Sequence, residues 1–189
     1  MSAILLKAPE IEPLSLLEAK QFLRVEHDAD DTVIAALIAA ARGHVEAQTR
    51  CALLTQTWRL SLDCWPGDGR IAPRLAPLQQ VAAARVFDGG GVPQQIDVGR
   101  FVVDLAGGVI AAPAWSLPLP GRPVGGIELD VVCGFGNAPS DVPEVLRHAV
   151  RTLIAHWYEN RGLTAIGQSV AMMPASVAAM IGAYRVRAL

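Results

Sequence analysis

Hydrophobic residues recur at helical spacing in three stretches of the chain, and the longest of them lies in the last third. Over residues 142–161 apolar side chains follow one another three and four positions apart, which is typical of an amphipathic helix. Asp141, Pro143 and Glu144 provide an N-cap, a first-turn proline and an acidic N3 residue. Gly162 provides a C-terminal stop. These signals predict a long helix over about residues 142–161.

Two further helices are predicted near the N-terminus. Residues 15–18 read Ser-Leu-Leu-Glu, a capping box that precedes an apolar stripe, so we expect a helix over about residues 16–24. The acidic run 28–31 ends this helix and caps a second one, over about residues 32–49.

Between these helices the pattern changes to an alternation with a period of two. Residues 55–65 alternate in this way and lead into Pro-Gly-Asp-Gly, which predicts a strand and a turn. Glycine- and proline-rich segments separate the later apolar runs, so we expect a small antiparallel sheet with at least two hairpins. The further strands are expected at 81–87, 101–105, 109–112 and 127–132.

The order of elements is helix, helix, several strands, long helix and tail. Helices and strands are segregated along the chain, which predicts an α+β fold. We expect a helical bundle, made of two N-terminal helices and one long C-terminal helix, with an inserted small antiparallel β-sheet and a C-terminal tail. A length of 189 residues predicts a single domain. Its parts are helices at about 16–49, a β-rich insertion at about 54–134, the long helix at about 142–161 and the tail at about 163–189.

The tail, residues 163–189, is mostly apolar, and its only charged residues are Arg185 and Arg187. Such a segment must be buried, either in its own domain or against a neighbouring subunit. In the whole chain 52% of the residues are hydrophobic and only 18% are charged, which favours an oligomer whose apolar surface is covered by other subunits. We therefore expect the tail to contact another chain.

Candidate interface residues lie at the end of the long helix and in the tail. An arginine at a helix end can pair with a carboxylate across a subunit contact, or it can simply complement the helix dipole in solvent. Apolar residues at helical spacing in the tail fit either subunit packing or the protein's own core. The predicted interface with another chain comprises Glu159, Arg161, Met172, Met173, Val177, Met180, Ile181, Tyr184, Arg185 and Arg187.

The charge of the chain is nearly balanced, with 16 basic and 18 acidic residues and a formal net charge of −2. No basic run is present, so the sequence does not indicate binding to nucleic acid through a basic patch. No stretch reaches the roughly 18 apolar residues of a membrane span, and residues 1–10 lack a signal peptide's features. We expect synthesis in the bacterial cytoplasm and no membrane partner. Three widely spaced cysteines, Cys51, Cys64 and Cys133, are expected to be buried free thiols.

Patterns that would indicate catalysis or metal binding are weak. The acidic run 28–31 beside His27 lacks the glycine and the distant glutamate of a calcium loop, and we interpret it as a solvated helix start. His148 and His156 are eight residues apart, too far to share a metal ion on one helix. The glycine run 89–91 is not followed by a helix, and no serine-nucleophile motif is present. We expect no enzymatic activity, cofactor or metal.

Several segments, in their order and spacing, resemble the phage head–tail connector family. No single motif is specific, but together they extend over nearly the whole chain. The β-rich middle is similar to that of the connectors of prophages and of phage-like gene transfer agents. The segments that carry the resemblance are 12–20, 22–25, 30–31, 34–42, 54–58, 142–147, 156–161, 174–177 and 184–186.

The resemblance implies a non-enzymatic adaptor without a cofactor, located at the head–tail interface of a virion or phage-like particle. Such adaptors form a ring, typically of twelve subunits, below the portal, where the ring extends the DNA channel and docks the stopper or tail. The implied partners are further copies of the chain, the portal protein and stopper or tail proteins, and DNA passes without sequence-specific binding. We expect the tail to reach the portal or a neighbouring subunit, and the β-rich middle to face the next subunit or the stopper. A chain without residues 163–189 is accordingly expected to fold but not to assemble.

Two alternatives remain open from the residues alone. One is a hydrolase with an unrecognised site, which requires His148 or His156 beside a nucleophile or carboxylate in a cleft. The other is a non-viral binding module whose sheet recognises a peptide or sugar. Solvent-facing aromatic side chains on the sheet would favour the binding module, whereas inward-turned Trp58 and Trp65 would count against it.

Overall fold

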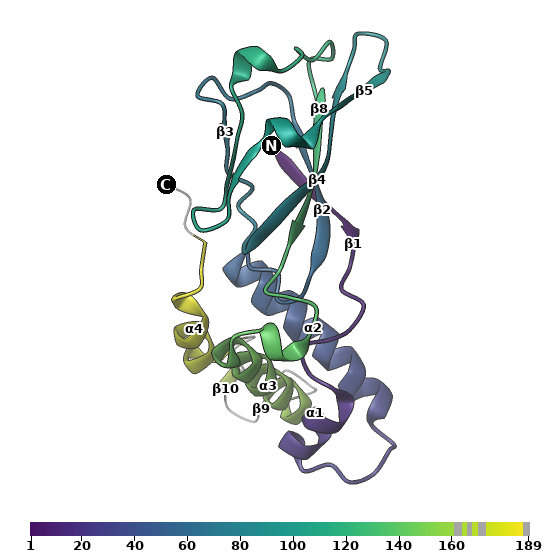
Figure 1. Cartoon of the computed structure of the whole chain (residues 1–189). Helices are drawn as coiled ribbons and strands as arrows, with labels where there is room; N and C mark the ends of the chain where they lie inside the picture. The colour runs from purple at the N-terminus through teal and green to yellow at the C-terminus, as the bar shows by residue number, and fades with distance from the viewer. Residues whose placement is uncertain (161–163, 166–167, 170–172, 187–189) are drawn as a thin grey trace. The chain divides into compact units, whose positions relative to one another are not determined.

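The structure is a computed structural model of the whole chain, and it describes residues 1–160, 164–165, 168–169 and 173–186 (Figure 1). The described chain divides into two compact units. Residues 1–9 and 55–134 form the first, which we call the sheet unit. Residues 10–54 and 135–186 belong to the second, which we call the helical unit. The single domain that the sequence predicts therefore comprises two units, and the division falls at the ends of the predicted β-rich insertion.

The helical unit contains the three predicted helices and a fourth, short one in the tail. The apolar faces of these helices meet in one core, which the periodic spacing of their hydrophobic residues requires. The sequence predictions of helices over 16–24, 32–49 and 142–161 are confirmed to within two residues at each end. The elements are α1 (Leu16–Leu23), α2 (Asp31–Thr49), the 3₁₀ turn η3 (Pro139–Asp141), α3 (Glu144–Glu159), the short strands β9 (Thr164–Ala165) and β10 (Gln168–Ser169), and α4 (Ala175–Gly182).

Helix α1 begins at the predicted capping box. The backbone N–H of Glu18 donates to Ser15 Oγ over 3.1 Å, and the backbone N–H of Ser15 donates to Glu18 Oε2 over 2.9 Å. Arg147 of α3 holds this end of α1 in place, because its Nη2 donates to Glu18 Oε1 over 2.7 Å and its Nε donates to the carbonyl oxygen of Pro13 over 3.1 Å. The capping box thus also provides the carboxylate through which α1 is joined to α3.

Two predicted helix caps differ from the structure. Asp141 does not cap α3, because it ends the preceding turn η3 and its Oδ2 accepts from the backbone N–H of Ala138 over 2.9 Å. Pro143 occupies the cap position of α3 instead. At the start of α2 the cap residue is Asp30, but its side chain makes no capping bond. Its Oδ2 accepts from the hydroxyl of Tyr158 at the end of α3, a partner that becomes available only in the folded unit.

The sheet unit contains a five-stranded antiparallel sheet in the order β1-β2-β8-β4-β5 and a three-stranded antiparallel sheet in the order β3-β7-β6. The predicted strands correspond to β2, β4, β6, β7 and β8, whereas β1, β3 and β5 were not predicted. The strands are β1 (Ser2–Lys7), β2 (Gln56–Leu62), β3 (Arg70–Ile71), β4 (Leu78–Phe87), β5 (Pro93–Ile96), β6 (Val102–Asp104), β7 (Val109–Ala111) and β8 (Ile127–Cys133), with 3₁₀ turns η1 (Val98–Arg100) and η2 (Ala114–Ser116).

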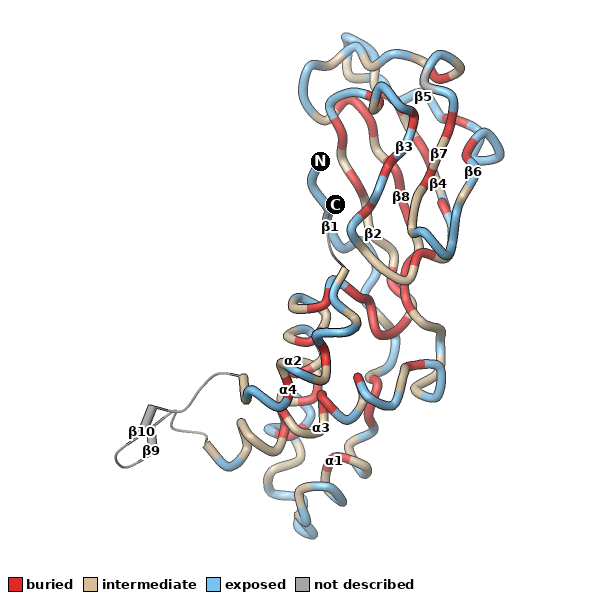
Figure 2. Tube along the Cα trace, turned by 90° about the vertical axis from the view of Figure 1, so that its left-hand side faces the viewer, coloured by how far each residue is buried: buried red, intermediate tan, exposed pale blue. Residues whose placement is uncertain are grey.

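The register of the central strands places apolar and charged residues on opposite faces. Leu60 of β2 and Ala84 of β4 both pair with Leu129 of β8, and all three are fully buried. The next residue of β8, Asp130, pairs with Arg59 of β2, so it belongs to the opposite face. Figure 2 shows the buried positions recurring along β2, β8 and β4. One face of the sheet therefore forms the core of the unit, and the other carries charge.

Candidate interaction surfaces

The charged face of the five-stranded sheet carries a cluster of two arginines and two carboxylates. Arg59 donates to Asp130 through two nitrogens, from Nε to Oδ1 over 2.7 Å and from Nη2 to Oδ2 over 3.1 Å. Arg85 donates from Nη2 to Asp130 Oδ2 over 2.8 Å. Both guanidinium groups also lie 3.4 Å from Glu128 Oε2. Both arginines of this cluster are therefore paired with carboxylates.

The cluster shifts the pKa of Asp130. Burial of the carboxyl raises its pKa, but hydrogen bonds from Arg59 and Arg85 and the attraction of their charges outweigh burial, and the pKa lies below its ordinary value. Hydrogen bonding to Asp130 likewise raises the pKa of Arg59. The carboxylate therefore stays ionised at neutral pH, and the charges within the cluster are paired with one another.

Two edges of the sheet unit expose apolar side chains. Strand β1 is the first strand of the five-stranded sheet, and Ile4, Leu5 and Leu6 on it are exposed to 59, 41 and 46%. Strand β6 is an outer strand of the three-stranded sheet, and Val102 on it is exposed to 72% and Leu105 just after it to 56%. Both edges were missed as candidate sites from the sequence, because β1 was not recognised as a strand and no sequence pattern reveals which strand is outermost.

A proline-rich loop of the sheet unit between β7 and β8 is a third exposed apolar feature. Trp115 in the turn η2 is exposed to 89%, and Leu119 and Val124 are exposed as well. Trp65, in contrast, is buried, and its indole N–H donates to the carbonyl oxygen of Pro118 over 2.9 Å. Trp58 is half-buried on the core side of β2. The inward position of these two tryptophans counts against a sheet face that binds a peptide or sugar.

Two apolar residues in the described part of the tail are buried within their own chain. Val177 and Ile181 of α4 are 0 and 1% exposed and belong to the core formed by α2 and α3. Met173, Met180 and Tyr184 are partly buried against the same core. Both side chains are covered within their own chain and so leave little surface for a partner. The assignment of Val177 and Ile181 to an interface stays a prediction.

The remaining predicted interface residues have different positions. Glu159, at the end of α3, is exposed. Arg185 is also exposed, but it is joined to α2, since its Nε donates to the carbonyl oxygen of Gln48 over 3.0 Å and its Nη2 donates to Gln48 Oε1 over 3.1 Å. Arg161, Met172 and Arg187 lie outside the described residues. For Glu159, Met173, Met180, Tyr184 and Arg185 the interface assignment stays a prediction.

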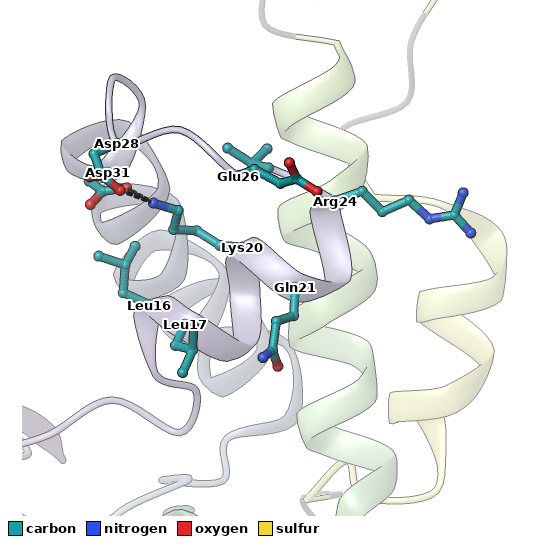
Figure 3. A pocket seen from close by; sticks show the side chains of 9 residues that line it. Leu16, Leu17, Lys20, Gln21, Arg24, Glu26, Asp28 and Asp31 are labelled. Atoms are coloured by element: carbon teal, nitrogen blue, oxygen red, sulfur yellow. Dashed lines mark hydrogen bonds and ion pairs between the residues drawn. The ribbon is translucent and has the colours of Figure 1, made fainter.

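A shallow depression of about 900 Å³ lies on the helical unit beside α1. Figure 3 shows Lys20 at its centre, extended toward Asp28 and Asp31. Lys20 Nζ lies 2.6 Å from Asp28 Oδ1 and 2.7 Å from Asp31 Oδ1. Hydrogen bonds from Lys20 lower the pKa of Asp28. Two carboxylates of the acidic run 28–31 thus form ion pairs with Lys20. This agrees with the interpretation of the run as the start of a helix.

The two histidines that the sequence suggested for chemistry, His148 and His156, both lie on α3. His148 is exposed on α3 and stacks edge-on against Phe22. Within the described residues, no group of three or more His, Cys, Asp or Glu side chains is placed to hold a metal ion. In the same part of the chain, no helix has the length and apolar character that crossing a membrane requires.

The cysteines differ from one another. Cys51 and Cys133 are buried, as predicted, whereas Cys64 is exposed, which corrects the expectation of three buried thiols. Burial raises the pKa of Cys133 to about 12, so its thiol stays protonated and unreactive at neutral pH. Cys64 follows the end of β2, where the alternation that buries Leu62 has ended.

Comparison with known proteins identifies a protein family whose model matches part of the chain. Residues 126–185, which include β8, α3 and α4, match the model of the phage gp6-like head–tail connector protein family. No curated protein matches the chain.

Three solved structures resemble the whole chain. A chain in the neck of an empty gene transfer agent (GTA) particle, computed with C6 symmetry, is 32% identical with a TM-score of 0.81. A chain in the virion of a native GTA particle is 29% identical, also with a TM-score of 0.81. A chain in the neck of a native GTA particle, computed with C12 symmetry, is 28% identical with a TM-score of 0.73. In each case the similarity covers 100% of this chain and 98% of the other.

Proposed function

The chain belongs to the family of phage gp6-like head–tail connector proteins, and we propose on this premise that it forms a closed ring in the neck of a phage-like particle. The family role is structural and not enzymatic. The observation that carries the proposal is similarity over the full length, at up to 32% identity, to chains found in the necks of gene transfer agent particles.

A ring of twelve copies fits the relatives best. Their neck structures were computed with C6 and with C12 symmetry, and a ring of twelve identical subunits satisfies both. A cyclic ring needs one surface of a subunit to contact a different surface of the next. The low charge content of the chain agrees with repeated apolar contacts between copies.

The proposed ring surrounds a DNA channel and binds a portal on one side and a stopper or tail on the other. The charge distribution supports passage without binding, because the sheet unit has as many acidic as basic residues, seven of each, and its clustered arginines are paired. Unpaired arginines would contact phosphates and resist DNA movement in a salt-dependent way. For the portal we propose the surface around the end of α3 and α4, which includes Glu159 and Arg185. For the stopper or tail we propose the loop that contains Trp115.

The test is electron microscopy of the purified full chain and of head particles that carry its portal. We expect closed rings, at the portal vertex if not in free solution, and class averages with twelvefold symmetry. A protein that remains monomeric in solution and does not bind portal-bearing heads would refute the proposal.

A further inference from the structure

Closing a ring requires two complementary surfaces on different sides of one rigid body. The inference below rests on the proposed ring. The contact of a cyclic ring is heterologous, so a subunit must offer one surface to the copy before it and another to the copy after it. The sheet unit is a candidate for this body, because two of its edges expose apolar side chains.

Strand β1 provides one edge. All six residues from Ser2 to Lys7 are exposed, and β1 is hydrogen-bonded to β2. Among the described residues no strand pairs with its other side. Natural proteins protect such edges with prolines, charges or a covering segment, because an open apolar edge pairs with other chains. Ile4, Leu5 and Leu6 lie in succession on β1 without a charge between them.

Strand β6 provides the other edge. It is the outer strand of the three-stranded sheet, and Val102 on it is among the most exposed apolar residues of the chain. Val98 in η1 and Leu105 after β6 are exposed as well. Strand β5, the outer strand of the larger sheet, is less suitable for pairing, because Pro93 lacks an N–H group.

These two edges lie on opposite sides of the sheet unit, as Figure 2 shows with β1 on the left and β6 on the right. We propose that the β1 edge of one copy packs against the β6 edge of the next, so that the sheet units form a continuous belt around the ring. The occupant of each edge is therefore a second copy of this chain. This arrangement covers the exposed valines and leucines at both edges and leaves the paired arginines and the Trp115 loop outside the contact.

Two charged variants of the full chain test the contact. Ile4→Glu/Leu6→Glu places charges on the β1 edge, and Val102→Glu places one on the β6 edge. Val124→Glu is the matched control, because Val124 is 75% exposed, close to the 72% of Val102, but lies in the loop between β7 and β8. All four substitutions in these three variants are at exposed positions, so we expect thermal unfolding as in the unchanged protein. Rings on portal-bearing heads, counted by electron microscopy, are expected to fall at least tenfold for either edge variant and to be unchanged for the control.

Mixing the two edge variants identifies the partners. In the mixture, the unchanged β6 edge of the first variant can pack against the unchanged β1 edge of the second. The two edges that remain free in this pair both carry introduced charges, so no further copy can be added. Chemical cross-linking followed by mass measurement is expected to give a 1:1 pair, whereas each variant alone gives monomers. Rings that persist in either edge variant would overturn the inference. A mixture without the 1:1 pair would overturn it as well, under conditions in which the unchanged protein forms rings in solution. The proposed function fails separately, if the unchanged protein forms no ring.

Discussion

Single residues decide the electrostatics of the sheet unit, and Asp130 is the clearest case. Its side chain is 9% exposed and accepts hydrogen bonds from both Arg59 and Arg85. In the sequence Asp130 is simply a polar residue in the alternation of β8. The adjacent strands β2 and β4 each place an arginine beside it, so its role follows from strand order and not from its own neighbours in the chain.

Substitution of Asp130 is expected to destabilise the protein. Asp130→Asn removes the charge that two partly buried guanidinium groups share, and losing one partner of such a cluster costs roughly 3 kcal/mol of unfolding free energy. Glu128→Gln is the matched control, because Glu128 lies beside the same arginines at 3.4 Å. We expect it to cost less than half as much in urea unfolding. Equal losses for the two variants would contradict the assignment of Asp130 as the centre of the cluster.

Acid is expected to weaken the fold through the same residue. The folded-state pKa of Asp130 lies below its ordinary value, so its contribution is fully present above the unfolded-state pKa, about 3.9. That contribution is lost as the pH falls through the lower, folded-state pKa. Unfolding free energies of the unchanged protein, measured by urea at a series of pH values, should drop below about pH 4. Asp130→Asn should show a smaller drop, and an identical pH profile for the two proteins would be evidence against this linkage.

At the scale of elements, α4 is a helix whose local sequence pattern allowed two different positions for its apolar side chains, and packing selected one of them. Its apolar residues at helical spacing fitted either a subunit contact or the protein's own core. The core of α2 and α3 has space for Val177 and Ile181, and both are fully buried there. Helix α4 therefore supplies two residues of the core. The expectation that a chain without residues 163–189 still folds stays a prediction, and the loss of these two core residues makes a lower stability the expected result.

Shortening Ile181 tests this role of α4. Ile181→Ala removes a buried side chain and leaves a cavity, so we expect a loss of about 2–4 kcal/mol of unfolding free energy. Ala179→Ser on the exposed side of the same helix is the control and should change stability by less than about 0.5 kcal/mol. Both are measured by chemical denaturation. A loss below 1 kcal/mol for Ile181→Ala would indicate that α4 is not packed against this core in solution.

At the scale of the whole molecule, the chain joins two units that are suited to different contacts. The helical unit contains the ion pairs of Lys20 and Arg147 and most of the segment that matches the connector family. The sheet unit has a buried core, a cluster of paired charges on the opposite face of its larger sheet, and two edges with exposed apolar side chains. A connector must hold its own copies together and also bind different components of the particle, and the two units together provide enough distinct surfaces for both tasks.

The sequence by itself determined the three main helices, five of the strands and the α+β class, because these follow from local periodicity, caps and turns. It did not reveal β1, whose apolar run has no alternation, or the short strands β3 and β5. Interaction surfaces were the hardest to predict. The residues named from the tail include two that the core buries, and the open edges at β1 and β6 were missed. Which strand ends a sheet, and which apolar residue stays uncovered, depends on residues far apart in the chain, so only the tertiary structure decided it.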